Sequence, residues 1–513
     1  MMTELSLIEV LNATANKYAD CSALISNDQS HTFLELKKAS DQCAVGLLKQ
    51  GVVKGDRIAL YCINSLEFAI AYMGIVKAGA VVVPINLLQK PAEIVYVMDN
   101  ANVTGIIYHE AFQTNTHDIL NALRFPILSI CVGSGSKEAI DWERFLDNDG
   151  VLPEIPIDPK NDLVAILYTS GTTGKPKGAM LTHQNLVSNT ASVFEAMKWQ
   201  AGKEKIILVL PMFHAFAATV GMLTPLTHGC CFVPIAKFEP DNLLHTIEAT
   251  QSTVFLGVPS MYNVLLNTSD DKAKRFNSIK LCVSGGASMP VDVLKRFEEK
   301  FGVAIYEGDG PTECSPVTCV NPVGGVRKVG TVGKPVPRVE MKILDEQGEE
   351  RPLGQIGEIA VRGDNVMKGY WKLPEATEAS FFEDWFLTGD LGTEDEEGYF
   401  SILDRKKDMI IVNGMNVYPR IIEEVLYRYE AVLEAAVIGQ ADKLHGEIPV
   451  AYIALKEGFE IESADIRRWC RQHLGNYEVP RKVVFMDALP KNGTGKIVKR
   501  VLNKQGEIER GVQ

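Results

Sequence analysis

Residues 168–178 carry glycine, hydroxyl and lysine side chains in a pattern typical of a loop that binds phosphate. The glycines allow backbone N–H groups to approach an anion closely, and the hydroxyl groups are further hydrogen-bond donors. Lys175 and Lys177 add positive charge, so a polyphosphate is the ligand that suits this stretch. The residues that we expect to contact it are Thr169, Ser170, Gly171, Thr172, Thr173, Gly174 and Lys177.

This stretch differs from a P-loop, in which Gly-Lys is followed by a Ser or Thr that holds magnesium and opens a helix. Here Pro176 follows Gly174-Lys175, and the short apolar run 179–181 precedes Thr182, which can cap a helix. The apolar run 163–167 predicts a strand, so the order is strand, loop, strand. Composition alone also leaves open a flexible surface loop, because Gly, Ser and Thr are common turn residues.

Other segments place charged or small side chains beside apolar runs that predict strands. Taken alone, His214 beside aromatic residues is more often a core residue, Asp390 reads as a turn aspartate, and residues 404–408 read as a solvated turn. The segments that could carry chemistry are residues 210–216, 284–288, 306–313, 385–390, 404–408, 413–416 and 490–496.

Together with the glycine-rich loop, these segments resemble the signatures of the adenylate-forming superfamily, which includes acyl-CoA synthetases, luciferases and the adenylation domains of peptide synthetases. The resemblance covers nearly the whole chain. Long-chain fatty acid–CoA ligases are the most similar branch, on the segments around Pro211, Ser284, Glu307 and Asp404. The resemblance implies an ATP-dependent ligase that forms acyl-AMP and pyrophosphate, and then acyl-CoA and AMP, with Mg²⁺ and coenzyme A.

The resemblance also implies the nucleotide site. Gly286 and Ala287 are implied to border the acyl chain and adenine, and Asp390 to accept hydrogen bonds from the ribose hydroxyls. Arg405 is implied to contact ribose and phosphate. The remaining members of the implied nucleotide site, in the adenine and magnesium motif, are Glu307, Gly308, Asp309, Thr312 and Glu313.

Catalysis and movement are likewise implied by resemblance. Lys496 is the implied adenylation lysine, and Glu313 and Thr172 are the implied magnesium ligands. His214 is implied to lie near the carboxylate being activated. The implied hinge is Lys407, and a segment that swings in to line the pantetheine tunnel contains Gly414. The chemistry needs positioning and charge neutralisation, with no general base.

Two positions depart from the family pattern. Asp309 stands where a Tyr usually covers adenine, and Pro311 replaces a more usual Leu, Met or Gln. Aromatic contact of this kind contributes on the order of 0.5–1.5 kcal/mol beyond buried area, so its loss weakens ATP binding without abolishing it.

The implied acyl pocket is apolar and offers no carboxylate for an α-amino group, so we expect a medium- to long-chain fatty acid rather than an amino acid. Its apolar members include Val220, Gly221, Val258 and Met261. Alternatives are a fatty acyl-AMP ligase that serves a carrier protein, and an aryl or other carboxylic acid–CoA ligase. A luciferase-like oxygenase and a degenerate binding protein are further alternatives.

Chain length, net charge and cysteine content limit the number of domains, the kinds of partner and the cellular location that we expect. A chain of 513 residues predicts two or more domains. The net charge of -13 argues against nucleic acid as a partner. The ten cysteines form no CxxC pair, and we expect neither a signal peptide nor a transmembrane segment, so the expected location is the cytoplasm. The sequence does not determine the oligomeric state, and a homodimer is one candidate.

We expect an α/β fold. Alternating strand and helix patterns, such as strand 57–62, a helix after Ser65 and strand 81–83, predict parallel sheets with flanking helices. A small β subdomain is expected from residue 330 to residue 363. The expected domains are residues 1–404, which bind acid and ATP, and a small mobile α+β domain, residues 405–513, with the catalytic lysine and the thiol tunnel.

Overall fold

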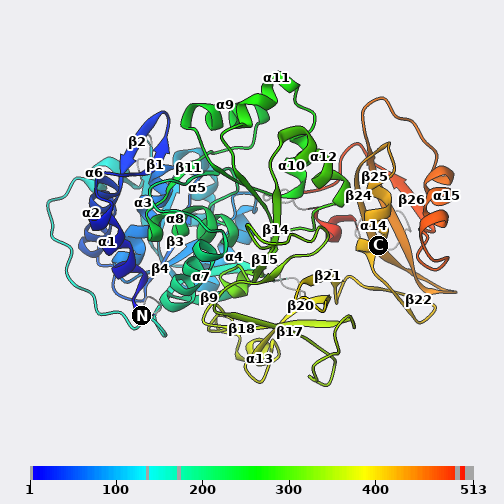
Figure 1. The fold of residues 1–513 in the computed structure, drawn as a ribbon. Coiled ribbons are helices and arrows are strands. Elements are labelled where there is room, and N and C mark those ends of the chain that lie inside the picture. The colour runs from blue at the N-terminus through cyan, green and yellow to red at the C-terminus, as the bar shows by residue number, and fades with distance from the viewer. Residues whose placement is uncertain (1–3, 134–137, 170–174, 492–496, 503–513) are drawn as a thin grey trace.

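The structure is a computed structural model that describes residues 4–133, 138–169, 175–491 and 497–502. Two large sheets, with helices between them and on their outer faces, make up most of the chain (Figure 1). A smaller antiparallel sheet and a C-terminal α+β part follow. This architecture confirms the predicted α/β fold class.

The first sheet has seven strands in the order β7-β6-β5-β3-β4-β8-β9. Pairing is parallel throughout except between β8 and β9, the strands on either side of the predicted phosphate loop. The strands are β3 (Arg57–Tyr61), β4 (Val81–Pro84), β5 (Val103–His109), β6 (Leu128–Val132), β7 (Ile140–Asp141), β8 (Leu163–Thr169) and β9 (Lys177–Thr182).

The predicted β-α-β unit and the predicted helix cap at Thr182 are both confirmed. α3 (Leu66–Lys77) connects the parallel strands β3 and β4, and the Ser65 side chain accepts a hydrogen bond from the Phe68 N–H at its start. Thr182 caps α7 (His183–Ala196) in the same way. Both helices are buried around most of their circumference because they lie in the core shared by the two sheets.

The second sheet has nine strands in the order β16-β15-β14-β13-β12-β10-β11-β1-β2, parallel from β14 to β1 and antiparallel at both ends. Its strands are β1 (Ser22–Ser26), β2 (Gln29–Thr32), β10 (Lys205–Leu208), β11 (Cys231–Pro234), β12 (Val254–Gly257), β13 (Leu281–Ser284), β14 (Ile305–Asp309), β15 (Cys319–Val320) and β16 (Lys334–Pro335).

Further helices cover and connect the two sheets. They are α1 (Leu7–Lys17), α2 (Phe33–Lys49), α4 (Pro91–Ala101), α5 (Gln113–Ala122), α6 (Trp142–Leu146), the π-helix η3 (Ala217–Leu223), α8 (Thr224–His228), α9 (Pro240–Thr250), α10 (Pro259–Leu265), α11 (Asp270–Ala273), α12 (Val291–Phe301) and the 3₁₀ turn η5 (Thr312–Cys314). None of the helices within the described residues is long and apolar enough to cross a membrane.

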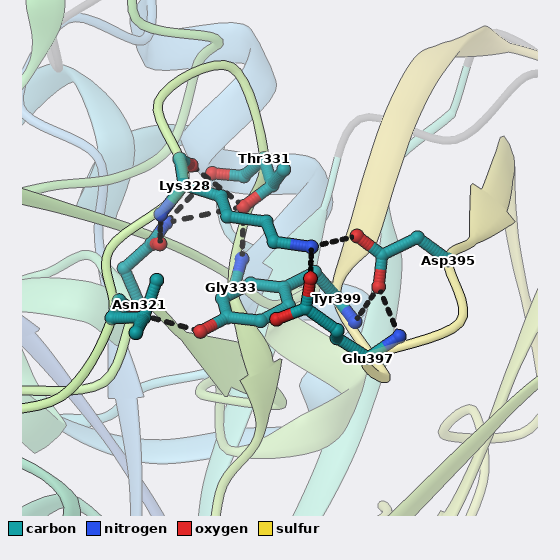
Figure 2. Close-up of polar contacts among 8 residues, drawn as sticks. Asn321, Lys328, Thr331, Gly333, Asp395, Glu397 and Tyr399 are labelled. Carbon is teal, nitrogen blue, oxygen red and sulfur yellow. Dashed lines mark hydrogen bonds and ion pairs between the residues drawn. The ribbon is translucent and has the colours of Figure 1, made fainter.

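A five-stranded antiparallel sheet forms a β subdomain, which runs from residue 339 to residue 405 and so extends beyond the predicted range of 330–363. Its elements are β17 (Val339–Leu344), β18 (Gly357–Gly363), β19 (Phe381–Phe382), β20 (Trp385–Glu394) and β21 (Phe400–Arg405), with the short helix α13 (Pro374–Glu378). A cluster of polar contacts joins its β20–β21 turn to the loop that precedes β16 (Figure 2). Lys328 Nζ lies 2.6 Å from Asp395 and 2.8 Å from Glu397, and the Tyr399 ring lies 4.5 Å below the same nitrogen.

The C-terminal part has the α+β composition that the sequence predicts. Its sheet has the order β23-β22-β25-β24, with β26 paired in parallel to β25. The elements are β22 (Ile410–Val412), β23 (Met415–Val417), α14 (Pro419–Tyr427), β24 (Val432–Asp442), β25 (Gly446–Leu455), α15 (Ser463–His473) and β26 (Lys482–Phe485).

Candidate active site

The carboxyl ends of β8 and β14 bring the predicted phosphate loop and the predicted metal ligand together, although these strands belong to different sheets. Thr169 ends β8, and its hydroxyl donates a hydrogen bond of 3.4 Å to Glu313 Oε1. Glu313 lies in η5, shortly after β14. Thr169 pairs with Lys177 across β8 and β9, so both ends of the predicted loop are fixed here. Ligands commonly bind at such strand ends in α/β sheets.

Residues 367–371 form a backbone connection between β9 and Glu313 that the sequence did not reveal. The N–H of Met367 donates to the Glu313 carbonyl at 2.7 Å. Farther along, the N–H of Met180 donates to the Gly369 carbonyl at 2.9 Å, and the N–H of Trp371 to the Gly178 carbonyl at 2.7 Å. We call residues 367–371 the strap. It fixes β9, which follows the predicted phosphate loop, relative to Glu313, the predicted metal ligand.

Tyr370, in the strap, points its hydroxyl at the same carboxylate. Its hydroxyl donates to Glu313 Oε1 at 2.9 Å, and the Lys177 ammonium lies 5.0 Å from the centre of its ring. Burial, and secondarily the negative charge of Glu313, raise the pKa of Tyr370 above the usual range of a phenol. The phenol is therefore protonated at neutral pH and can donate this hydrogen bond.

An arginine–carboxylate pair joins β20 and β21 at the same place. Asp390 and Arg405 are opposite each other in the antiparallel register, and Arg405 Nε lies 2.8 Å from Asp390 Oδ1. Asp390 raises the pKa of Arg405, and the charges of Asp309 and Glu313 add to the effect. The predicted ribose carboxylate therefore pairs directly with the Arg405 guanidinium, and the charges of Asp309 and of the predicted metal ligand Glu313 act on the same group.

Glu307 is a buried carboxyl group near the end of β14, with 3% of its surface exposed. Its Oε1 accepts a hydrogen bond of 2.9 Å from the Met289 N–H, which fixes the turn that follows β13. Burial raises the pKa of Glu307 to about 7, whereas the nearby positive charge of Arg420 acts in the opposite direction. Among the described residues, its Oε2 has no hydrogen-bond partner.

Gly308 and Asp309 continue β14 into its antiparallel pairing with β15. The Asp309 carbonyl accepts a hydrogen bond of 3.0 Å from the Thr318 N–H, and Pro311 lies just before η5, which begins at Thr312. A Cβ atom at Gly310 would come within 1.7 Å of the Pro316 carbonyl, so only glycine fits between the two segments. The departures at positions 309 and 311 thus sit in a tightly packed turn beside Arg405.

The segments predicted to border the acid also meet. A Cβ atom at Gly285 would lie 3.2 Å from the Phe216 ring and 3.6 Å from the Gly308 carbonyl, and one at Gly286 would lie 3.8 Å from Val258. Ala287 follows in the same turn and is half-buried. His214 lies two residues before Phe216, and its Nδ1 accepts from the Phe216 N–H at 3.4 Å.

The predicted apolar pocket residues differ in what they contact. Val220, Val258 and Met261 are buried. At Gly221, a Cβ atom would come within 2.3 Å of Leu208 in β10, so this glycine serves the packing of η3 on the sheet.

The predicted hinge residue, Lys407, is exposed in the turn between β21 and β22. Asp404, three residues before it, connects β21 to the start of α14: Oδ1 accepts from the Arg405 N–H at 2.8 Å and Oδ2 from the Arg420 N–H at 2.9 Å. Lys499 forms a 2.8 Å ion pair with Glu423 of α14, and its charge also acts on Asp404. Lys499 thereby lies close to the predicted hinge.

Gly414 lies apart from the groups above, at the tip of the β22–β23 hairpin with a φ of +81°. The hairpin lies at the outer edge of the C-terminal sheet, well away from β14 and β20 (Figure 1). Six predicted site residues lie outside the described part of the chain: Ser170, Gly171, Thr172, Thr173, Gly174 and Lys496.

Sequence reasoning missed three residues that this arrangement singles out. Tyr370 and Arg420 carry no local signal, because their importance arises from partners far along the chain. Phe216 stands two residues after His214, and the aromatic residues there were read as surroundings only.

The comparisons with known proteins cover almost the entire chain. Residues 11–371 match the family described as AMP-binding enzyme, and residues 421–496 match the AMP-binding enzyme C-terminal domain. A long-chain fatty-acid–CoA ligase of Bacillus subtilis (strain 168) is 35% identical over 525 residues, which cover 97% of this chain and 94% of that protein.

Two solved structures share the fold. The anthranilate CoA ligase AuaEII in complex with anthranoyl-AMP has a TM-score of 0.92 at 27% identity, covering 99% of this chain and 98% of that one. ATP-bound MatB from Rhodopseudomonas palustris has a TM-score of 0.89 at 32% identity, and the match covers 98% of this chain and 99% of that one. The site holds carboxylate, hydroxyl and guanidinium groups near the strand ends, and these matches extend over the full length of the chain. The chain therefore belongs to the AMP-binding enzyme family and is an AMP-forming acid–CoA ligase of that family.

Proposed function

We propose that this enzyme joins a medium- or long-chain fatty acid to coenzyme A. The observation that carries the fatty-acid assignment is the apolar corner beside the nucleotide groups, where Phe216 and Val258 approach Gly285 and Gly286. An aliphatic chain gains about 0.8 kcal/mol for each methylene group that leaves water, so such a corner favours longer acids over acetate. The B. subtilis relative, named a long-chain fatty-acid–CoA ligase, supports the same assignment.

In this proposal the nucleotide lies across the ends of β8 and β14 and the Asp390–Arg405 pair of β20 and β21. Asp390 accepts hydrogen bonds from the ribose hydroxyls, and Arg405 contacts ribose and phosphate. The turn at Gly286 and Ala287 borders adenine together with residues 307–309. The phosphate contacts come from Thr169, Lys177 and Thr312, and from the loop residues Ser170, Gly171, Thr172, Thr173 and Gly174.

Glu313 and Thr172 are the residues that we assign to Mg²⁺. No group of three or more His, Cys, Asp or Glu side chains in the described residues is arranged to hold a metal ion. That sparse donor set fits Mg²⁺, which is commonly held by one or two carboxylates together with phosphate oxygens and water. Both hydrogen bonds that Thr169 and Tyr370 make to Glu313 end on Oε1, which favours Oε2 for the metal. When bound, Mg²⁺ would neutralise phosphate charge.

The chain's own groups then govern the first step. The carboxylate of the acid, near His214, attacks the α-phosphorus, and the bond to pyrophosphate breaks. Lys496 brings an ammonium group that opposes the repulsion between the two anions and stabilises the charge that develops. Arg405 remains on the AMP portion. No proton has to be removed from the acid, since its carboxylate is ionised at neutral pH.

In the second step the thiol of coenzyme A attacks the acyl carbonyl, and AMP leaves. We assign residues 1–404 and 405–513 to two domains that turn about Lys407. In the orientation described here, Lys499 pairs with Glu423 of α14 and its charge acts on Asp404, close to the proposed hinge. We propose that this orientation serves acyl-AMP formation, the step to which we assign Lys496. Gly414 lies in the β22–β23 hairpin at the edge of the C-terminal sheet, and a second orientation would bring it to the thiol path.

The direct test is AMP release from ATP, with and without coenzyme A, across acetate, octanoate, palmitate, anthranilate and several amino acids. We expect kcat/KM to rise from acetate to the fatty acids, and CoA to be required for multiple turnovers. The highest kcat/KM for acetate or an amino acid would exclude the proposal.

An aryl acid–CoA ligase is the second candidate. The fit to the anthranilate ligase and the Phe216 ring beside Gly285 favour it. Anthranilate as the best acid in the same panel would select it. Acyl-AMP formation without any response to CoA would instead select a fatty acyl-AMP ligase that serves a carrier protein.

A further inference from the structure

Tyr370 touches two groups that the proposed function assigns to different parts of the ATP complex. Its hydroxyl lies 2.9 Å from Oε1 of the metal carboxylate Glu313, and its ring faces the ammonium of the phosphate residue Lys177 at 5.0 Å. The two contacts use opposite properties of one side chain: a hydrogen-bond donor at the tip and an electron-rich face.

The backbone around Tyr370 holds this side chain in place. Its own N–H donates to Thr377 Oγ1 at 2.8 Å, and the strap is bonded on one side to β9 and on the other to the Glu313 carbonyl. The Tyr370 side chain is half-buried. A rigid donor is what orients a carboxylate, because a bond from a mobile group would not restrict the rotation of the carboxylate.

We propose that Tyr370 is a positioning residue that fixes the Glu313 carboxylate for Mg²⁺ and holds the Lys177 ammonium for phosphate. This inference rests on the proposed function of the same site. A neutral phenol suits the task because it donates a hydrogen bond without neutralising the carboxylate, so the full negative charge remains for the metal. A lysine in the same place would compete with Mg²⁺ for that charge.

Two variants separate the two contacts. Tyr370→Phe removes the hydroxyl and keeps the ring, whereas Tyr370→Leu removes both. The first readout is the dissociation constant of Mn²⁺, measured by water-proton relaxation with a non-hydrolysable ATP analogue at saturation. The second is the KM for ATP at saturating Mg²⁺ in acid-dependent pyrophosphate exchange.

We expect Tyr370→Phe to weaken Mn²⁺ binding on the order of tenfold, as for the loss of a hydrogen bond to a charged group, and to change the KM for ATP less than about twofold. Tyr370→Leu should weaken Mn²⁺ binding equally and also raise the KM for ATP. Adding Tyr370→Phe to Glu313→Gln should change Mn²⁺ binding little, because the carboxylate that it positions is gone.

Tyr399→Phe is the matched control. Tyr399 also donates its hydroxyl, to the Val326 carbonyl at 2.6 Å, and also has a lysine over its ring, Lys328 at 4.5 Å (Figure 2). It lies outside the proposed site. Its loss should lower the melting temperature without moving Mn²⁺ binding.

Each outcome decides the inference. The inference is overturned if Tyr370→Phe binds Mn²⁺ as tightly as the wild type does. It is also overturned if adding Tyr370→Phe to Glu313→Gln weakens Mn²⁺ binding as much as it does in the wild type, or if Tyr399→Phe weakens Mn²⁺ binding as much as Tyr370→Phe does. If Tyr370→Phe unfolds at the assay temperature whereas Tyr399→Phe does not, the residue is structural and the inference is also overturned. If the wild type shows no pyrophosphate exchange with any acid, the proposed function is overturned instead. The Mn²⁺ dissociation constants do not depend on that assay, so they distinguish failure of the proposed function from failure of the inference about Tyr370.

Discussion

Glu307 illustrates how burial changes the chemistry of a single side chain. Its pKa rises from the ordinary value of 4.5 to about 7, chiefly because the carboxyl group is buried. The native state therefore binds a proton between these two pH values that the unfolded chain has released. Stability from this group is fully present below pH 4.5 and is lost as the pH rises to about 7.

We expect Glu307→Gln to remove this pH dependence, because glutamine does not titrate. Between pH 4.5 and pH 7, the free energy of unfolding of the wild type should fall relative to that of the variant. The fall should be on the order of 3 kcal/mol at most, and the difference between the two proteins should be constant above pH 7. Urea unfolding at several pH values measures it. A constant difference from pH 4.5 upward would show that Glu307 is ionised throughout in the folded protein.

Single residues also show where sequence reasoning succeeds and where it ends. Asp390 and Arg405 could be singled out because each lies in a recognisable motif, and the register of β20 and β21 places them side by side. Tyr370 could not, because its partner Glu313 lies 57 residues away and nothing local marks an aromatic side chain as a carboxylate's donor. Contacts made through tertiary structure leave no periodic signal in the sequence.

Among the elements, the turn between β21 and β22, which contains Lys407, is the one on which domain movement would depend. Asp404 receives two backbone N–H groups, from Arg405 at the end of β21 and from Arg420 at the start of α14. If residues 405–513 rotate about Lys407, the bond to Arg420 must break. Asp404 therefore stabilises the orientation described here over any other.

We expect Asp404→Asn to slow acyl-AMP formation several-fold while changing thioester formation from supplied acyl-AMP little, because an amide cannot accept both N–H groups equally well. Rates of the two half-reactions, measured separately, test this. Asp395→Asn is the control, since Asp395 likewise accepts two N–H groups, from Glu397 and Tyr399, but lies away from the hinge (Figure 2). An equal slowing of both half-reactions by Asp404→Asn would contradict the assigned role.

Most elements could be read from local signals. Ser65 and Thr182 begin helices because their side chains accept a hydrogen bond from the first turn, which sequence spacing reveals. The strap could not be predicted, because residues 367–371 pair with β9 and η5 without forming a regular strand of their own. The π-helix η3 was likewise not predicted, since its apolar residues fit several helix types.

At the scale of the whole molecule, the two proposed half-reactions require opposite ends of the C-terminal part. Lys496→Ala should nearly abolish acyl-AMP formation and leave CoA transfer from supplied acyl-AMP largely intact, because thioester formation does not need the ammonium. Gly414→Trp should do the reverse, since a bulky side chain would fill the proposed thiol path. Separate assays of pyrophosphate exchange and acyl-CoA formation check both. Equal damage to both half-reactions by Lys496→Ala would exclude domain alternation.

The strap also has a consequence for how the enzyme acquires its ligand site during folding. The Thr169–Glu313 contact joins residues 144 positions apart, and Trp371, at the end of the strap, donates to the Asn100 carbonyl across 271 positions. Such distant contacts close only after most of the chain is ordered, since loop closure costs entropy before the contacts form. ATP therefore has no complete site to bind on a partly folded chain. It should protect the finished enzyme by slowing unfolding, and it should not speed the recovery of native protein from denaturant.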